Sequence, residues 1–231
     1  MSSLDHSKVT PISLGHVNAY LIETDRGHIL VDTGMPNAGE KLDEAFEAAG
    51  VDPQSVQLIV LTHGHMDHVG CLAHVRQRTG AQVLCHRSLA ERLAQGKMEP
   101  AVARGLLGRL ITLLSGLTGS LEITKADFVV DDAFDLSPFG ITGKVIHTPG
   151  HSASSLSILL GNGEALVGDL VRDQRSGEIG LGMFHEDEQV LFDSLDRVLA
   201  LEPRAIYLSH GGCVDHQALK AFAEANRPKE A

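Results

Sequence analysis

The chain has 231 residues, of which 43% are hydrophobic and 21% charged, and its formal net charge at pH 7 is −11. This composition is typical of a globular protein with a substantial core, and the acidic excess argues against a nucleic-acid partner held through phosphate contacts. Its three cysteines, Cys71, Cys85 and Cys213, have no CxxC spacing, and no apolar run reaches the ~18 residues of a membrane span, so we expect a reduced, cytoplasmic protein without membrane association.

The first part of the chain alternates between strand-like and helix-like patterns. A turn at 25–27 separates two β-type runs, which predicts an opening hairpin. Helical spacing begins after Asn37, the expected N-cap, and stops at Gly50. The expected strands of this part are 19–24, 28–34, 56–62 and 81–86, and the expected helices are 37–50 and about 69–80.

Residues 87–122 depart from this alternation. Ser88 with Glu91 three residues later predicts a capping box, and Pro100 opens a longer apolar pattern of helical type. The apolar positions of that pattern are Val102, Leu106, Leu107, Leu110, Leu113, Leu114 and Leu117. We predict a helical apolar insertion here, which is a buried core helix, a lid over an active site or a dimer contact.

The last part of the chain is rich in β-type runs and ends in helices. The expected strands are 134–141, 143–150, 155–160, 164–169 and 205–210, and the expected helices lie at about 190–199 and 216–225. Each part therefore contributes both strands and helices. This pattern predicts a single domain over residues 1–231, in which two sheets pack face to face with helices outside, a four-layer αββα sandwich of the α/β (α+β) class.

Ligand-type side chains are concentrated directly after the expected strand 56–62. The stretch "THGHMDH" contains His63, His65, Asp67 and His68, and imidazole and carboxylate groups are the ligands that zinc and similar cations take. Alternate side chains of an extended loop point the same way, so His63 and His65 can share one ion while Asp67 and His68 face a second position. So short a loop cannot surround an ion. Further candidates, each at the end of an apolar strand, are Asp32, His151, Asp169 and His210.

The ordered set "VDTG", "THGHMDH", "TPGHS", "VGD" and "LSHG", spread over residues 31–211, resembles the metallo-β-lactamase superfamily. The resemblance implies one ion held by His63, His65 and His151, and a second held by Asp67, His68 and His210. It further implies that Asp169 bridges both ions, that Asp32 steadies the ligand loop, and that Asp67 assists proton transfer. The implied cofactors are two divalent cations, zinc first with manganese or iron(II) as alternatives, and the implied nucleophile is a hydroxide between them.

Residue identities narrow the reaction that the resemblance implies. Asp169 stands where the best-known β-lactamases have a cysteine, so the glyoxalase-II-like, lactonase-like and phosphodiesterase-like branches fit better. The chain ends soon after His210, which argues against the added helical domain of standard glyoxalase II. In "GDLVRDQR" no tyrosine follows Asp169, so Arg172 would supply the polar contact that lactonases take from tyrosine. We expect a hydrolase that cleaves an ester, lactone or thioester of a small, partly apolar substrate, and we expect the apolar insertion to favour a homodimer.

Three other functions stay open on the same motifs. They are a persulfide dioxygenase-like oxidoreductase with one iron held by two histidines and an aspartate, a phosphodiesterase, and a metal-binding module without turnover. The remaining histidines lack matching spacing and are expected not to be ligands. His16 and His185 are expected on the surface, with a place at the edge of the pocket as the alternative. These non-ligand histidines are His6, His16, His28, His74, His86, His147, His185 and His216.

Overall fold

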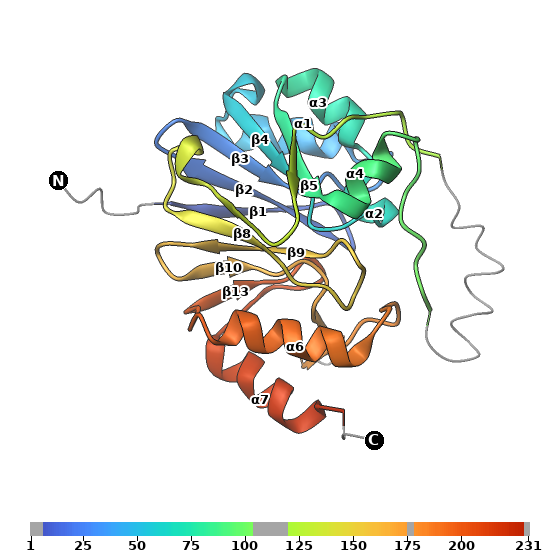
Figure 1. The fold of residues 1–231 in the computed structure, drawn as a ribbon. Helices are drawn as coiled ribbons and strands as arrows, with labels where there is room; N and C mark the ends of the chain where they lie inside the picture. The colour runs from blue at the N-terminus through green and yellow to red at the C-terminus, as the bar shows by residue number, and fades with distance from the viewer. Residues whose placement is uncertain (1–6, 104–119, 175–177, 229–231) are drawn as a thin grey trace.

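The computed structural model describes residues 7–103, 120–174 and 178–228. Two mixed β-sheets face each other, with α1, α3 and α4 outside the first sheet and α6 and α7 outside the second (Figure 1). Within these ranges each of the two sheets has six strands, and a separate two-stranded ribbon accompanies them. The predicted αββα sandwich is therefore confirmed. The longer apolar helix expected after Pro100 falls mainly on residues outside the described ranges.

The sheets and helices have the following bounds. The first sheet consists of β1 (Val9–Ser13), β2 (Asn18–Thr24), β3 (Gly27–Val31), β4 (Val56–Val60), β5 (Gln82–His86) and β6 (Phe128–Val130), in that order. The second consists of β14 (Cys213–Val214), β13 (Ala205–Tyr207), β10 (Glu164–Leu166), β9 (Leu156–Leu160), β8 (Gly143–His147) and β7 (Ala133–Asp135), in that order. The ribbon pairs β11 (Arg172–Asp173) with β12 (Ile179–Gly180). The α-helices are α1 (Gly39–Ala49), α2 (Met66–Val69), α3 (Leu72–Thr79), α4 (Arg87–Leu93), α6 (Glu188–Leu199) and α7 (His216–Asn226), and 3₁₀ turns lie at Pro53–Ser55 and Ser137–Phe139.

Three hydrophobic cores separate the four layers. Strand β3 shows how the pleat divides them, because Leu30 packs toward the helices of the first sheet whereas Ile29 and Val31 pack between the sheets. The third core lies between the second sheet and α6 and α7, where Phe192 and Leu219 are fully buried. Each sheet is therefore covered on both faces, which accounts for strands that read as continuous apolar runs.

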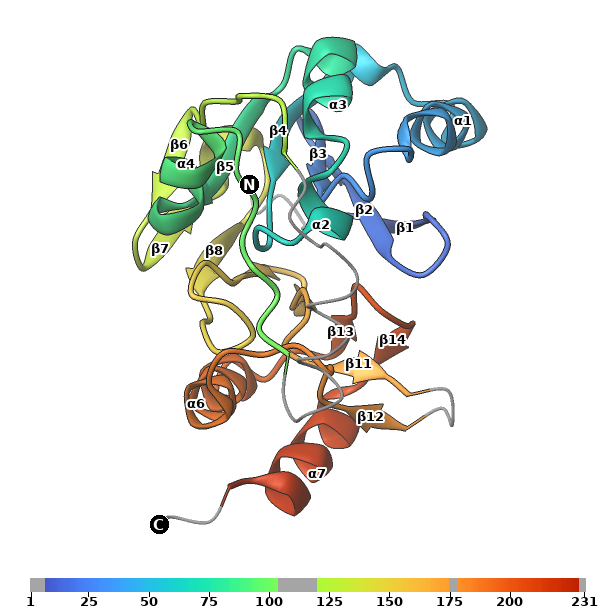
Figure 2. The same ribbon diagram turned by 90° about the vertical axis from the view of Figure 1, so that its right-hand side faces the viewer.

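Strand direction brings the polar ends of the strands to one edge of the sandwich. In the first sheet β3 and β4 are parallel, so their carboxyl ends lie at the same edge. In the second sheet β8 and β10 are both antiparallel to β9, and β10 is parallel to β13, so these three strands also end together. Figure 2 looks onto this end of the molecule, where α2 lies between the helices of the first sheet and those of the second. The candidate ligands follow these strand ends.

Several local expectations change in the structure. The opening hairpin and the stop at Gly50, which has φ 66°, are confirmed. Asn37 as the N-cap of α1 is wrong, because a turn from Met35 to Ala38 precedes the helix and leaves Ala38 at that position without a side-chain cap. The capping box at Ser88 is also wrong, since α4 begins earlier and the Nδ1 atom of His86 accepts the Ser88 N–H instead.

Two further expectations about helices and strands are corrected. The helix expected over about 69–80 is α3, which begins only at Leu72, because Gly70 and Cys71 separate it from the short helix α2, which ends at Val69. The strand expected over 134–141 is only β7, because the proline in the following segment opens a 3₁₀ turn, Ser137–Phe139. No helix of the described part of the chain is long and apolar enough to cross a membrane.

Candidate metal centre

Five chain segments supply the polar residues at the edge of the sandwich. His63 and His65 lie in the loop after β4, and α2 carries Asp67 and His68. His151, Asp169 and His210 come from the loops that follow β8, β10 and β13. All of the ligands that the sequence predicted are thus brought to one place. They form two groups, each with three members, and a third group of His63, His68 and Asp169 connects these two.

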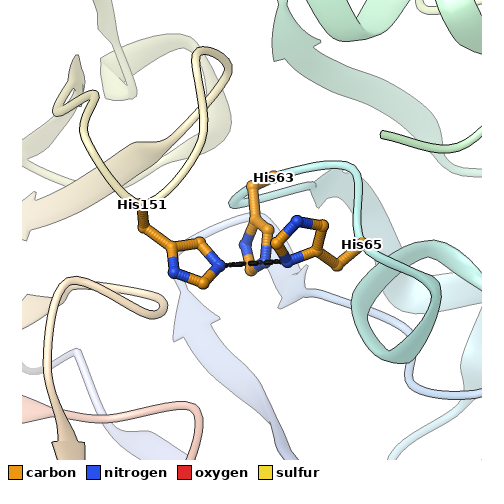
Figure 3. Close-up of side chains that lie close together, drawn as sticks. All are labelled: His63, His65 and His151. Atoms are coloured by element: carbon orange, nitrogen blue, oxygen red, sulfur yellow. Dashed lines mark hydrogen bonds between the residues drawn. The ribbon is translucent and has the colours of Figure 1, made fainter. Parts of the chain in front are cut away.

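The first group is the tri-histidine cluster of His63, His65 and His151. The His63 Nε2 and His65 Nδ1 atoms are 3.0 Å apart, and His151 Nε2 lies 3.2 Å from the former and 3.0 Å from the latter. Figure 3 shows the three rings turned toward one another, with His151 arriving on a different loop from the other two. All three residues are buried.

This geometry fits a small cation. Tetrahedral zinc with metal–nitrogen distances of ~2.0–2.1 Å separates its ligand nitrogens by about 3.3 Å, close to the spacing in the tri-histidine cluster. His63 Nδ1 lies 3.1 Å from Thr62 Oγ1, whose hydroxyl donates to Asp32, so Nδ1 carries the proton of His63 and its Nε2 presents a lone pair to the cluster. Three converging imidazole nitrogens that have few other partners are what a metal site requires.

The second group is the mixed cluster of Asp67, His68 and His210. His210 Nε2 lies 3.3 Å from Asp67 Oδ2, and His68 Nε2 lies 3.8 Å from Asp67 Oδ1. The ligand atoms of this cluster all lie within 4.8 Å of one another. His68 Nε2 is buried and has no hydrogen-bond partner among the described residues, so it is available to a cation.

Asp169 lies between the two clusters. Its Oδ1 atom is 3.4 Å from His68 Nε2, and its Oδ2 atom is 3.2 Å from His210 Nε2 and 3.7 Å from His151 Nε2. Oδ1 is buried and has no hydrogen-bond partner among the residues that the structure describes. One carboxylate therefore faces both the tri-histidine cluster and the mixed cluster, as a bridging ligand must.

The pKa values of the histidines are shifted in opposite directions in the two clusters. Burial lowers the pKa of His63, His65 and His151, to about 3 in the case of His151, so these imidazoles are neutral at pH 7. Burial also lowers the pKa of His68 and His210, but the nearby carboxylates outweigh it and raise these values to about 9 and about 10. Burial raises the pKa of Asp67 and Asp169, yet their histidine neighbours hold both values well below the usual range. In the metal-free protein, protons on His68 and His210 thus balance the two carboxylates.

Hydrogen bonds outside the clusters fix the rings. Asp32 is buried; its Oδ2 atom accepts from His68 Nδ1 at 2.8 Å and from the Thr62 hydroxyl at 2.7 Å, and its Oδ1 atom accepts the Thr62 N–H. His210 Nδ1 donates to the carbonyl oxygen of His16 at 2.6 Å. These contacts place the other ring nitrogen of His68 and of His210 toward the mixed cluster, as such outer contacts do in metal sites.

A cavity of about 340 Å³ opens onto both clusters. Four of the five methionines of the chain line it, together with Phe184 and Ala101. These methionines are Met35, Met66, Met98 and Met183. Arg172 and His16 also line the cavity, beside the predicted ligands His65, Asp67, His151, Asp169 and His210. The pocket is therefore mainly apolar, with the predicted metal ligands at one side and one guanidinium among its described lining residues.

The sequence missed several parts of this site. The methionines and Phe184 come from separate segments, and no spacing in the sequence connects them. His16 is exposed as expected, but it also lines the cavity, and its ring stacks on that of His210 at a centroid distance of 6.3 Å. The surface placement of His185 is wrong, because this residue is buried in the segment that precedes α6, where its Nδ1 lies 3.0 Å from the Gly182 carbonyl oxygen.

Comparisons with known proteins identify relatives over most of the chain. A protein from Caenorhabditis elegans named beta-lactamase-like protein 2 homolog is 28% identical over 206 residues, which cover 89% of this chain but only 59% of that protein. The probable metallo-hydrolase YqgX of Bacillus subtilis is 26% identical over 207 residues, which cover 87% of this chain and 88% of that protein.

Solved structures show the same fold. The metallo-beta-lactamase superfamily protein ST1585 from Sulfolobus tokodaii superposes with a TM-score of 0.71 at 22% identity, covering 96% of this chain and 87% of that one. The B3 metallo-beta-lactamase BLEG-1 gives a TM-score of 0.70 at 24% identity, covering 91% and 95%. The model of the metallo-beta-lactamase superfamily matches residues 12–210, which is most of the sequence. The chain therefore belongs to the metallo-β-lactamase superfamily.

Proposed function

We propose that this chain is a dinuclear metal-dependent hydrolase that cleaves an ester, lactone or thioester bond of a small substrate with an apolar part and an anionic group. The observation that carries the proposal is the position of Asp169 between the tri-histidine and mixed clusters, at one side of an apolar cavity. The name of the Bacillus subtilis relative, a probable metallo-hydrolase, supports the reaction class.

The residues present suit two divalent cations, and zinc suits them best because the donors are imidazole nitrogen and carboxylate oxygen. The tri-histidine cluster would hold one ion and the mixed cluster the other, with Asp169 as a ligand to both. Bound divalent cations supply Lewis acidity toward a carbonyl oxygen and ionise water near neutral pH, since they lower its pKa to about 7.

Asp67 is the group on this chain best placed to move a proton. It lines the cavity, and as a carboxylate it is ionised at neutral pH and has oxygen atoms that can accept a proton. Its carboxylate is partly exposed, with 25% of the side-chain area accessible, whereas Asp169 is more enclosed at 12%. Asp67 can therefore take a proton from an attacking water and pass it to the leaving group.

The lining of the cavity selects the apolar part of the substrate. Methionine side chains are unbranched and polarisable, so four of them adapt to acyl or alkyl groups of different shapes. A cavity of about 340 Å³ is at the small end of the range for ligand pockets, which favours a small substrate.

Arg172 selects the anionic part. Its half-buried side chain lines the cavity, and it forms no hydrogen bond or ion pair with any residue in the described ranges, although the chain as a whole carries a net charge of −11. An unpaired guanidinium beside an apolar wall suits a carboxylate or phosphate on the substrate, because it offers charge-assisted hydrogen bonds in a fork geometry.

The experiment that tests the reaction combines metal analysis with a substrate panel. The purified chain is analysed for metal content and assayed with lactones, thioesters, phosphodiesters, a β-lactam and two aryl esters of similar length, 4-nitrophenyl butyrate and mono-4-nitrophenyl succinate. We expect two ions per chain, loss of ester or lactone turnover on chelation, and recovery with zinc or manganese. His65→Ala and Asp169→Ala are expected to lower kcat/KM by orders of magnitude. One iron per chain with oxygen consumption, or turnover that persists after complete chelation, would contradict the proposal.

The same panel tests Arg172. Arg172→Ala is expected to raise KM for the succinate ester by about 10-fold while the butyrate ester changes little, because only the former carries an anion to pair. Arg172→Lys keeps the charge and is expected to lie between the two. Arg78→Ala, which removes an exposed arginine on α3, is the control. An equal change in KM for both esters would show that Arg172 does not bind the anionic group of the substrate.

A further inference from the structure

Glu99 is a buried carboxylate that contacts the loops of the tri-histidine cluster. It lies in the segment that the sequence assigned to an apolar insertion, and only 4% of its surface is exposed. Its Oε2 atom accepts the N–H of Gly64 at 2.9 Å and the hydroxyl of Ser154 at 2.6 Å. Gly64 stands between His63 and His65, and Ser154 follows His151 by three positions. One oxygen atom thus connects both loops that carry the cluster.

Glu99 binds both backbone polar groups of Gly64. The backbone N–H of Glu99 donates to the Gly64 carbonyl oxygen at 2.8 Å, while the Glu99 side chain accepts the Gly64 N–H. A Cβ atom on Gly64 would lie 2.7 Å from Glu99 Cγ and 2.6 Å from Leu89 Cδ1, so the glycine permits this close approach. The orientation of the two histidines beside Gly64 therefore depends on the position of Glu99.

The segment that bears Glu99 is itself anchored. The guanidinium of Arg92, on α4, donates to the carbonyl oxygen of Met98 at 2.8 Å, and Met98 lines the cavity. Among the residues that the structure describes, the Glu99 carboxylate accepts hydrogen bonds from a backbone N–H and a hydroxyl, both uncharged donors, and its negative charge also acts on His65. A buried carboxylate held by uncharged donors is stabilised by a nearby cation, which the tri-histidine cluster would hold.

We propose that Glu99 is a positioning residue that joins the loop of His63 and His65 to the loop of His151, and so sets the metal affinity of the tri-histidine cluster. This inference rests on the proposed metal site. It assigns to the segment after α4 a role in building the metal centre, in addition to its place in the wall of the cavity. Partners outside the ligand set commonly change metal affinity by about 10- to 100-fold, which is the size of effect expected here.

The test measures zinc affinity, not turnover, by competition with a chromophoric chelator. Glu99→Gln is examined in a His210→Ala background, which leaves the tri-histidine cluster intact, and in a His151→Ala background, which leaves the mixed cluster intact. We expect a loss of about 10-fold or more in the first background and less than about threefold in the second. Glu91→Gln, an exposed glutamate of α4, is the matched control and is expected to change neither.

A second variant covers the case in which Glu99→Gln does not fold. Ser154→Ala removes one donor to Glu99 without altering a charge, and it is expected to weaken the tri-histidine cluster by a few-fold with an unchanged far-UV circular dichroism spectrum. Wild-type zinc affinity of the tri-histidine cluster in both variants would overturn the inference, as would an equal loss at both clusters. If the unmodified chain binds no divalent metal, the proposed function fails first and independently of Glu99.

Discussion

Asp32 orients ligands of both clusters through a few hydrogen bonds. It has φ 61°, an uncommon conformation outside glycine that aspartate tolerates, and this turn directs its carboxylate to Thr62 and His68. The Thr62 hydroxyl donates to Asp32 and in turn accepts from His63 Nδ1. The buried Asp32 carboxylate therefore influences the tautomer of one histidine in each cluster, His63 and His68.

Asp32→Asn is expected to weaken zinc binding at the mixed cluster by about 10- to 100-fold. The asparagine oxygen would accept the Thr62 N–H, which turns the amide NH₂ toward His68 Nδ1 and favours a proton on the His68 Nε2 atom that should face the ion. The measurement is zinc titration in the His151→Ala background. Asp25→Asn, at an exposed turn, should leave affinity unchanged. Unaltered binding by Asp32→Asn would show that Asp32 does not orient His68.

The raised pKa values of His68 and His210 predict how metal affinity depends on pH. At pH 7 both imidazoles hold protons that an incoming cation must displace, so zinc affinity of the mixed cluster should rise from pH 7 toward pH 9. The tri-histidine cluster, whose histidines are already neutral, should show little change over this range. Calorimetric titration in buffers of different ionisation enthalpy measures the protons released. No proton release at pH 7 would contradict the assignment.

The same groups predict how the stability of the metal-free chain depends on pH. For His68 and His210 the folded pKa values, about 9 and about 10, exceed the ordinary value of 6.5, so their contribution is complete below pH 6.5 and is lost as pH rises through 9 to 10. His63, His65 and His151 are shifted in the opposite direction, so their contribution is lost as pH falls below 6.5. The free energy of unfolding of the chelated protein should therefore peak near pH 6 to 7, which denaturant titration at several pH values measures.

At the residue scale, the sequence indicated the candidate ligands and the supporting Asp32 but not the other supporting residues. The spacing of His63, His65, Asp67 and His68 after an apolar strand was enough to indicate a metal site. Glu99 and Ser154 act through contacts between segments distant in the chain, and isolated Glu and Ser residues have many other roles, so no pattern distinguishes them. Their roles and those of the predicted ligands stay predictions until metal binding is measured.

At the element scale, helix α6 positions the loop of His151. Ser194 on this helix donates to the Pro149 carbonyl oxygen at 2.7 Å, and the Asp187 N–H at its N-terminus donates to the Gly150 carbonyl oxygen at 3.0 Å. Gly150 has φ 126°, and a Cβ atom there would lie 2.3 Å from the backbone of Leu191. The loop can approach the helix this closely only because Gly150 has no side chain.

Gly150→Ala is expected to lower the free energy of unfolding by about 3 kcal/mol or more, since it combines a disfavoured φ with overpacking against α6. Gly50→Ala is the matched control, because it shares a positive φ of 66° but would meet no atom within 4 Å, and it should cost only about 1 kcal/mol. Urea unfolding monitored by circular dichroism compares the two. Equal losses would mean that contact with α6 does not constrain this loop.

Element boundaries show where sequence patterns fail. The C-terminal stops at Gly50 and Gly80 were predicted because left-handed residues favour glycine, and both glycines have positive φ. N-caps were less predictable because several side chains compete for the same role. His86 caps α4 in place of the expected serine, a choice decided by where β5 ends and the chain turns.

At the scale of the whole molecule, hydrogen bonds connect the two sheets beside the candidate metal centre. The Tyr20 hydroxyl, on β2, donates to the Leu208 carbonyl oxygen at 2.5 Å, and the side chain of Asn18 donates to the Gly211 carbonyl oxygen at 2.6 Å. The Asn18 N–H also donates to the Ser209 carbonyl oxygen. The segment that carries His210 is therefore held by the first sheet as well as by its own.

Because both sheets share one core and these contacts, we predict that the metal-free chain unfolds in a single transition, as the expected single domain requires. Tyr20→Phe should lower the free energy of unfolding by about 1–2 kcal/mol, because the Leu208 carbonyl loses a buried donor. Unfolding should still occur in one transition. Calorimetry compared with far-UV circular dichroism checks this. Two resolved transitions would indicate that the halves fold separately. The expected homodimer is a separate prediction that a measurement of molecular mass in solution would test.

The layered fold was predictable as a whole because alternating runs of strands and helices permit few arrangements. The cavity was not, because its wall is assembled from side chains of at least four separate segments whose packing the linear order does not reveal. The leucines expected to cover the active site lie largely outside the described residues, whereas Met98 and Ala101 from the same segment do line the cavity.

The methionine lining has a consequence for how this protein would respond to oxidants. Thioether sulfur is converted by peroxide to the sulfoxide, which is polar and reversible only by dedicated reductases. With Met35, Met66, Met98 and Met183 gathered around one cavity, mild peroxide should make the substrate wall hydrophilic while imidazole and carboxylate groups stay chemically intact. Peroxide treatment would then abolish the binding of apolar acyl groups while the zinc content of the protein stays unchanged. Methionine sulfoxide reductase would restore this binding.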